Sequence, residues 1–167
     1  MKNKILIIIS INLLFLGAGL NPVFALVHTQ KNGLFSMDIP EDWKWFEYQQ
    51  EIVITYPDGK TAAIDVQLVP SIKLSGADIK KTLKEGNDRM IKEGIEAHNG
   101  AFIGEKEISL DGVYATQLDF KTAPPSPVHV TYVAFLNKGY AFTITYGSGD
   151  DKLRSVMDDV IATFKFK

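Results

Sequence analysis

The C-terminal stretch YVAFLNKGYAFTITYGSGDDKLRSVMDDVIATFKF (residues 132–166) contains two apolar runs of period two, a turn signal and a helical pattern. Side chains at positions i and i+2 of a strand share one face, so residues 128–136 and 140–146 are each predicted to form a strand. Asn137, Lys138 and Gly139 separate the two runs, and so short a connection joins antiparallel neighbours. The stretch therefore begins with a predicted hairpin.

The second half of the stretch changes to helical spacing. Its apolar residues recur at i, i+3, i+4, i+7 and i+8: Leu153, Val156, Met157, Val160 and Ile161. This stripe predicts an amphipathic helix. Ser148, with Asp151 three residues later, resembles a capping box and predicts where the helix starts. Phe164 and Phe166 alternate with lysines and predict a short closing strand.

The same alternation extends towards the N-terminus. Further strands are predicted at residues 52–55, 63–68 and 114–120, and glycine-containing turn signals lie at residues 31–33, 57–60 and 110–112. Because tightly joined strands pair antiparallel, the sheet is predicted to be mostly antiparallel.

A second helix is predicted to begin at Ser75, to be interrupted at Gly86 and to end before His98. Its apolar stripe consists of Ile79, Leu83, Met90, Ile91 and Ile95. Each of the two amphipathic helices must cover a sheet face. The sequence therefore predicts an α+β protein with two main helices.

The N-terminus has the three parts of a secretory signal peptide. Lys2 and Lys4 form a basic head, residues 5–16 are mostly apolar, and Pro22 precedes a small residue, Ala25, at the predicted cleavage point. The alternative is an uncleaved membrane anchor, but the apolar run is shorter than the ~20 residues that usually span a bilayer.

Cleavage after Ala25 would remove residues 1–25 and leave a single domain over residues 26–167. We therefore expect an exported protein, periplasmic or extracellular, with no stable membrane insertion after cleavage.

Composition narrows the function classes. The 167 residues are 46% hydrophobic and 23% charged, as in ordinary soluble domains, and the formal net charge is −2. This balance argues against a nucleic-acid partner, which needs a basic stripe. The chain has no cysteine, so disulfides and an acylated-cysteine anchor are excluded, and stability must come from the core.

Several strings resemble the PsbP-like family: GLFSMDIPEDWKW (residues 33–45), YPDGKTAAIDV (56–66), LDGVYATQLDF (110–120) and the C-terminal stretch. The resemblance covers residues 33–167. It implies an α-β-α sandwich around a mostly antiparallel sheet, and a non-enzymatic accessory or binding role. Known members include an extrinsic lumenal subunit of photosystem II, so a thylakoid lumen location is expected only in a photosynthetic source. The motifs are structural, and no ligand residues carry over.

No motif with catalytic or metal-binding spacing is present. His28, His98 and His129 are far apart, without an H-x-H pair or an H-E-x-x-H helix. No serine lies in a G-x-S-x-G elbow. We predict no catalytic residue, no metal ligand and no cofactor.

Two features favour a partner contact. Pro124, Pro125 and Pro127 stiffen one loop, which is either a rigid connection between strands or a partner contact, because a stiff loop loses little entropy on binding. Trp45 and Phe46 fall on opposite faces of a predicted strand, so one of the two is expected to be exposed.

The leading interpretation is an exported, non-catalytic binding or accessory protein that acts by contact with an unidentified protein. The first alternative is a carrier of a small apolar ligand. The second alternative is an unrecognised hydrolase.

Overall fold

The computed structural model describes residues 25–59, 62–71, 74–125 and 127–167. The predicted signal peptide, apart from Ala25, lies outside the described residues. Across the described ranges, no helix is both long enough and apolar enough to cross a membrane.

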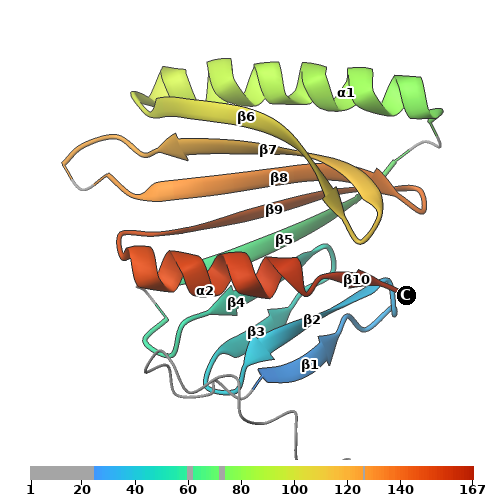
Figure 1. The fold of residues 1–167 in the computed structure, drawn as a ribbon, viewed down its shortest axis with the longest axis vertical. Helices are drawn as coiled ribbons and strands as arrows, with labels where there is room; N and C mark the ends of the chain where they lie inside the picture. Colours follow the sequence, from blue (N-terminus) through green and yellow to red (C-terminus); the bar gives the residue numbers. More distant parts are fainter. Residues whose placement is uncertain (1–24, 60–61, 72–73, 126) are drawn as a thin grey trace, which may run out of the picture.

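The main sheet has seven antiparallel strands (Figure 1). In spatial order they are β3 (Lys44–Glu47), β4 (Glu51–Thr55), β5 (Ala62–Pro70), β9 (Tyr140–Ser148), β8 (His129–Asn137), β7 (Val113–Lys121) and β6 (Ala101–Leu110). A smaller antiparallel sheet contains β1 (Ala25–Thr29), β2 (Phe35–Pro40) and β10 (Lys165–Phe166). The predicted hairpin at residues 137–139 joins β8 to β9, with positive φ at Lys138 and Gly139, as tight hairpins require.

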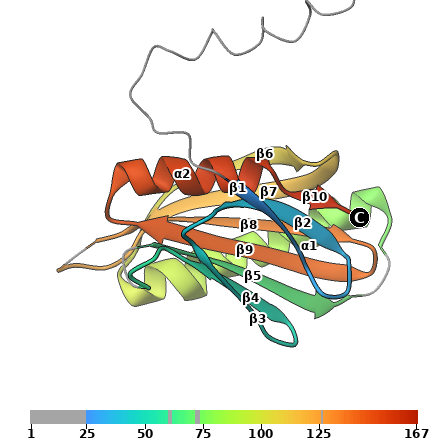
Figure 2. The same ribbon diagram turned by 90° about the horizontal axis from the view of Figure 1, so that it is seen from below.

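The helices lie on opposite faces of the main sheet (Figures 1 and 2). Helix α2 (Asp151–Ala162) packs with β2 on the face that carries Val133 and Phe135. Helix α1 (Gly76–Arg89) lies against the other face, where its Asn87 donates to Glu105 of β6 and its Lys80 lies over the Tyr114 ring of β7. The predicted α+β class and α-β-α arrangement are confirmed.

The main core lies between the large sheet and the layer formed by α2 and the small sheet. Met157, Val160 and Ile161 of α2 are buried there. Phe35 of β2 stacks on Phe164, with ring centroids 4.7 Å apart, and meets the edge of the Phe142 ring of β9 at 6.2 Å. These aromatic contacts join the two sheets.

Two sequence predictions about the helices were wrong in detail, and one strand was not predicted. Asp150, not Ser148, caps α2, because Ser148 is the last, buried residue of β9, and the Asp150 carboxylate accepts from the backbone N–H groups of Lys152 and Leu153. Gly86 does not interrupt α1. It lies on the exposed side of the helix, where an interior glycine costs only ~1 kcal/mol.

The third difference is β6, which the sequence did not predict. Its residues are mostly exposed and include Glu105, Lys106 and Glu107, so it lacks the apolar alternation of the other strands.

Helix α1 continues as a π turn (Met90–Ile95) and a 3₁₀ turn (Glu96–His98), which ends at Asn99 in the left-handed region.

Candidate binding surfaces

One face of the main sheet is open to solvent over β3, β4, β5 and β9. Along β4, β5 and β9 every second residue is buried against α2 and the small sheet, along β3 every second residue is half-buried, and the residues between them are exposed or half-buried. We call the latter residues the open sheet face: Lys44, Phe46, Glu51, Val53, Thr55, Ala63, Asp65, Gln67, Val69, Ala141, Thr143, Thr145 and Gly147. Helix α1 lies on the same side of the sheet, but packs over β7 and β8.

Three large side chains with apolar surface are exposed on the open sheet face or directly after β3. Phe46 is 44% exposed and Val69 is 53% exposed, and Tyr48, which follows β3, is 60% exposed. Phe46 lies directly opposite the half-buried Val53 in the β3–β4 register. An exposed aromatic group beside aliphatic neighbours is typical of a protein contact site.

The two predicted aromatic contact residues lie on opposite sides of β3. Trp45 points towards the small sheet, where its ring stacks on His28 at 5.4 Å between centroids and lies 6.4 Å from the Phe35 ring. Phe46 points towards solvent. Of this pair, Phe46 is therefore the residue that a partner can reach.

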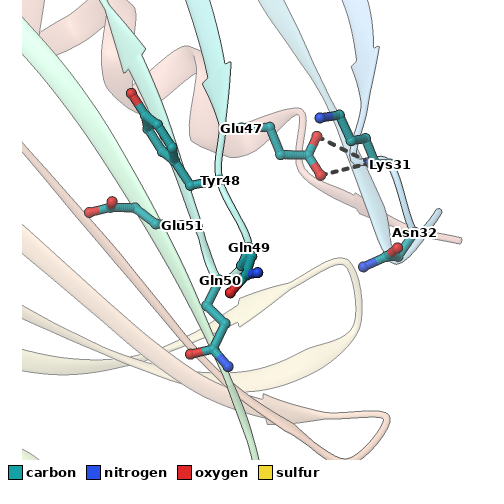
Figure 3. Close-up of a pocket in the computed structure, with 7 residues that line it drawn as sticks. All are labelled: Lys31, Asn32, Glu47, Tyr48, Gln49, Gln50 and Glu51. Atoms are coloured by element: carbon teal, nitrogen blue, oxygen red, sulfur yellow. Dashed lines mark hydrogen bonds between the residues drawn. The ribbon is translucent and has the colours of Figure 1, made fainter.

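A hollow of about 940 Å³ lies at the turn between β3 and β4 (Figure 3). It is lined by polar side chains and one tyrosine: Lys31, Asn32, Glu47, Tyr48, Gln49, Gln50 and Glu51. The Glu47 carboxylate accepts from the Lys31 backbone N–H at 3.0 Å and from Gln30 Nε2 at 3.2 Å, which ties the small sheet to β3. This polar lining does not suit an apolar ligand.

A second hollow, of about 500 Å³, lies between α1 and strands β6 and β7. Four of its six charged side chains are paired with one another, because Lys80 lies 3.2 Å from Glu107 and Lys84 lies 3.9 Å from Glu105. Neither of these two hollows supports the carrier alternative.

The predicted proline contacts lie in the connection between β7 and β8. Pro124, Pro125 and Pro127 are exposed. The base of this loop is closed by two hydrogen bonds between Thr122 and Val128, one from each backbone N–H, at 3.0 and 2.8 Å. We call residues 122–128 the proline loop.

Exposed apolar residues also lie at the proline loop's end of the sheet. Phe102 is 40% exposed and Ile103 is 51% exposed, at a β-bulge in β6 beside the end of β7 (Figure 1). Sequence reasoning missed both residues, because β6 itself was not predicted.

Three strands separate β3 from β8, a distance of about 19 Å at the usual strand spacing. The structure therefore does not bring Phe46 and the prolines together.

A polar cluster joins α2 to β7 and β8. Arg154 of α2 donates through Nη2 to Asp119 Oδ1 at 3.2 Å and to Thr131 Oγ1 at 3.3 Å, and Thr131 donates to Asp119 Oδ1 at 2.7 Å. Arg154 Nη1 lies 2.5 Å from His129 Nδ1. The histidine and carboxylate are those that a hydrolase could use, but the hydroxyl of this cluster belongs to Thr131, which is fully buried. Its contacts are those of a structural network.

Sequence reasoning did not find Arg154 or Asp119 as neighbours of His129. Arg154 lies beside the apolar stripe of α2, and no spacing rule links a helix position to a strand 35 residues away. Within the described parts of the chain, no group of three or more His, Cys, Asp or Glu residues is placed to hold a metal ion.

The arrangement of a seven-stranded antiparallel sheet between two helices, with a small sheet beside α2, defines an α+β protein of PsbP-like fold. No family model matches the chain, and no curated protein matches its sequence. The fold is similar to the solution structure of cyanobacterial PsbP (CyanoP) from Synechocystis sp. PCC 6803, with a TM-score of 0.68 and 14% identity over 90% of this chain and 96% of that chain.

Two further solved structures are similar. The Ran-binding protein Mog1p of Saccharomyces cerevisiae has a TM-score of 0.56 and 9% identity, over 85% of this chain and 95% of its own. LpqN of Mycobacterium tuberculosis, involved in cell envelope biogenesis, has a TM-score of 0.55 and 16% identity, over 88% of this chain and 92% of its own. At these identities the similarity shows the fold alone.

Proposed function

We propose that this chain is an exported, non-catalytic accessory protein that binds another protein through the open sheet face. The observation that carries this proposal is the exposure of Phe46 and Val69 on a sheet face that turns its alternate side chains to solvent, with the exposed Tyr48 two residues after Phe46. Large aromatic side chains supply much of the affinity at protein contacts, and a sheet face offers them a rigid platform. The name of Mog1p as a Ran-binding protein supports the idea that this fold serves protein contact.

Export rests on the N-terminal sequence. A basic head, an apolar run and a small residue at position 25 support a signal peptide over residues 1–25. N-terminal sequencing of the protein recovered from outside the cytoplasm of its own host is expected to begin at Leu26. Recovery of the intact chain from the membrane fraction would instead favour a retained anchor.

The binding surface is tested by affinity capture of the exported protein from its own host after mild cross-linking, with quantitative mass spectrometry. The double variant Phe46→Asp, Tyr48→Asp is expected to reduce recovery of the partner at least about tenfold, because a charge cannot replace a buried aromatic anchor. Both positions are exposed, so the fold should be unaffected.

Phe102→Asp with Ile103→Asp is the matched control, because these residues are exposed at the other apolar surface. It is expected to retain the partner. Loss of the partner in this control alone would place the contact at the proline loop's end, and retention in both variants would contradict a contact at either surface. The proline loop remains the second predicted contact, and Pro125→Ala with Pro127→Ala reports on it in the same assay.

A further inference from the structure

The contact between Arg154 and His129 fixes the protonation state of the histidine. A guanidinium N–H group can only donate a hydrogen bond, so His129 Nδ1, 2.5 Å from Arg154 Nη1, must accept with its lone pair. His129 is therefore neutral in this arrangement, with its proton on Nε2. The same guanidinium holds Asp119 and Thr131, so one side chain ties the first turn of α2 to two strands.

We propose that His129, Arg154, Asp119 and Thr131 form a proton-sensitive clasp, in which protonation of His129 releases Arg154 and loosens the first turn of α2 from β7 and β8. A proton on Nδ1 would place an N–H group against the N–H group of Arg154. It would also place two positive charges in direct contact, at a site where both side chains are less than a quarter exposed. Separation of Arg154 from the ring relieves both conflicts.

Charges on each neighbouring element oppose or favour this step. From β7, Asp119 favours a charged His129 and Lys121 opposes it; from α2, Asp151 favours it and Arg154 opposes it. From β9, Tyr146 donates to Asp158 at 2.7 Å, and stays neutral because burial raises its pKa. Asp119 Oδ1 is 3.9 Å from His129 Nε2, too far for a hydrogen bond, and Nε2 has no partner among the residues that the structure describes. The Asp119 carboxylate therefore offsets only part of the repulsion between a protonated His129 and Arg154.

The pKa of His129 determines how the stability of the closed clasp depends on pH. Burial, followed by Arg154, holds the pKa of His129 below its ordinary value of 6.5. The closed clasp therefore binds fewer protons than the open one, so it is fully stable above about pH 6.5 and loses stability as the pH falls below that value. The ratio of open to closed clasp then rises by up to about tenfold per pH unit, until His129 is protonated in the closed state too.

Release of Arg154 from His129 would affect two segments, the first turn of α2 and the proline loop. Arg154 lies in the first turn of α2, and His129 is the first β8 residue after the proline loop. Opening would free both segments at one end of the molecule, while Met157, Val160 and Ile161 keep the rest of α2 on the core. A protein outside the cytoplasm would in this way change one surface in response to external acidity.

Hydrogen exchange of the exported protein, corrected for the intrinsic pH dependence of exchange, tests the clasp between pH 8 and pH 5. Protection of the first α2 turn and the proline loop is expected to fall below pH 6.5, with the centre of the sheet unchanged. His129→Gln keeps a neutral acceptor and is expected to abolish the pH dependence. His28→Gln and His98→Gln are the matched controls and are expected to retain it.

Nuclear magnetic resonance titration of the unaltered protein gives a second measurement that needs no variant. The amide signals of the first α2 turn are expected to titrate with the midpoint of the His129 ring. Three outcomes would overturn the proposal: unchanged protection on acidification, an undiminished response in a folded His129→Gln variant, or a loss of protection spread evenly over the chain. Titration of the α2 amides with a different midpoint from the ring would also overturn it.

Discussion

Gly147 of β9 lies opposite Val130 of β8, on the open sheet face. A Cβ atom at this position would lie 2.7 Å from the His129 carbonyl oxygen and 3.0 Å from Val130 Cγ2. The His129 backbone belongs to a strand paired on both sides and cannot easily move away. We expect Gly147→Ala to lower the free energy of unfolding by ~1–3 kcal/mol, as overpacking usually does. Urea denaturation followed by tryptophan fluorescence measures this loss.

Gly149 provides the comparison two residues later. A Cβ atom there would meet no atom within 4 Å, so Gly149→Ala should change stability by less than ~0.5 kcal/mol. Equal losses in the two variants would show that the close approach to His129 is not the cause.

At the residue scale, period-two alternation predicted that Trp45 and Phe46 point in opposite directions, but not which of them is exposed. The answer depends on the small sheet, which brings His28 onto the Trp45 ring. The proximity of Arg154 and His129 depends in the same way on how α2 packs on the sheet, which lets one of its side chains reach β8. Such contacts come from packing between elements, which local spacing does not encode.

At the scale of elements, Asp150 satisfies the first free N–H groups of α2. Its carboxylate accepts from Lys152 N at 2.8 Å and from Leu153 N at 3.3 Å. We expect Asp150→Ala to lower the free energy of unfolding by ~1 kcal/mol, and Asp150→Asn to retain most of it, because asparagine is an equally good cap. Thermal unfolding followed by circular dichroism measures both. A larger loss for Asp150→Asn than for Asp150→Ala would contradict the capping role.

Strands and helices with clear periodicity were predictable. For a strand that is covered on both faces, the periodicity did not show which residues are buried most deeply. Residues 128–136 were predicted to form a strand from their alternation, but the strand carries apolar side chains on both faces, and the structure buries Val133 and Phe135 completely. Strand β8 packs against α1 on one face and contributes to the main core on the other, so both of its faces carry apolar residues. The exposed edge strand β6, with its charged side chains, gave no signal that distinguishes a strand from a loop.

At the scale of the whole molecule, an aromatic cluster holds the small sheet on the large one. Phe164 is 1% exposed, stacks on Phe35 and meets the edge of the Phe135 ring at 5.6 Å between centroids. We expect Phe164→Ala to lower the free energy of unfolding by ~3–5 kcal/mol, because the neighbours come from different sheets and cannot all move into the cavity. Urea denaturation measures the loss.

Phe102→Ala is the control for this prediction. Its side chain is 40% exposed, and the expected loss is below ~1 kcal/mol. A loss for Phe164→Ala as small as that for Phe102→Ala would mean that the cluster does not hold the two sheets together.

The order of strands was not predictable from the hairpins. Each tight turn predicted a pair of adjacent strands, but β5 also pairs with β9, and this contact crosses α1 and three other strands in the sequence. Local signals therefore predicted neighbours among the strands before α1 and among the strands after α1, but not how the two groups pair. The resemblance to PsbP-like proteins supplied the α-β-α arrangement.

The pairing of β5 with β9 has a consequence for how the chain is made. Pro70 pairs with Tyr140 and Ala62 pairs with Ser148, so the middle of the large sheet closes only after almost the whole polypeptide has been synthesised. Contacts so distant along the chain form slowly, because a long loop must be ordered first. Late closure of the sheet is compatible with the proposed export, because passage through a narrow secretion channel requires a polypeptide that has not yet folded.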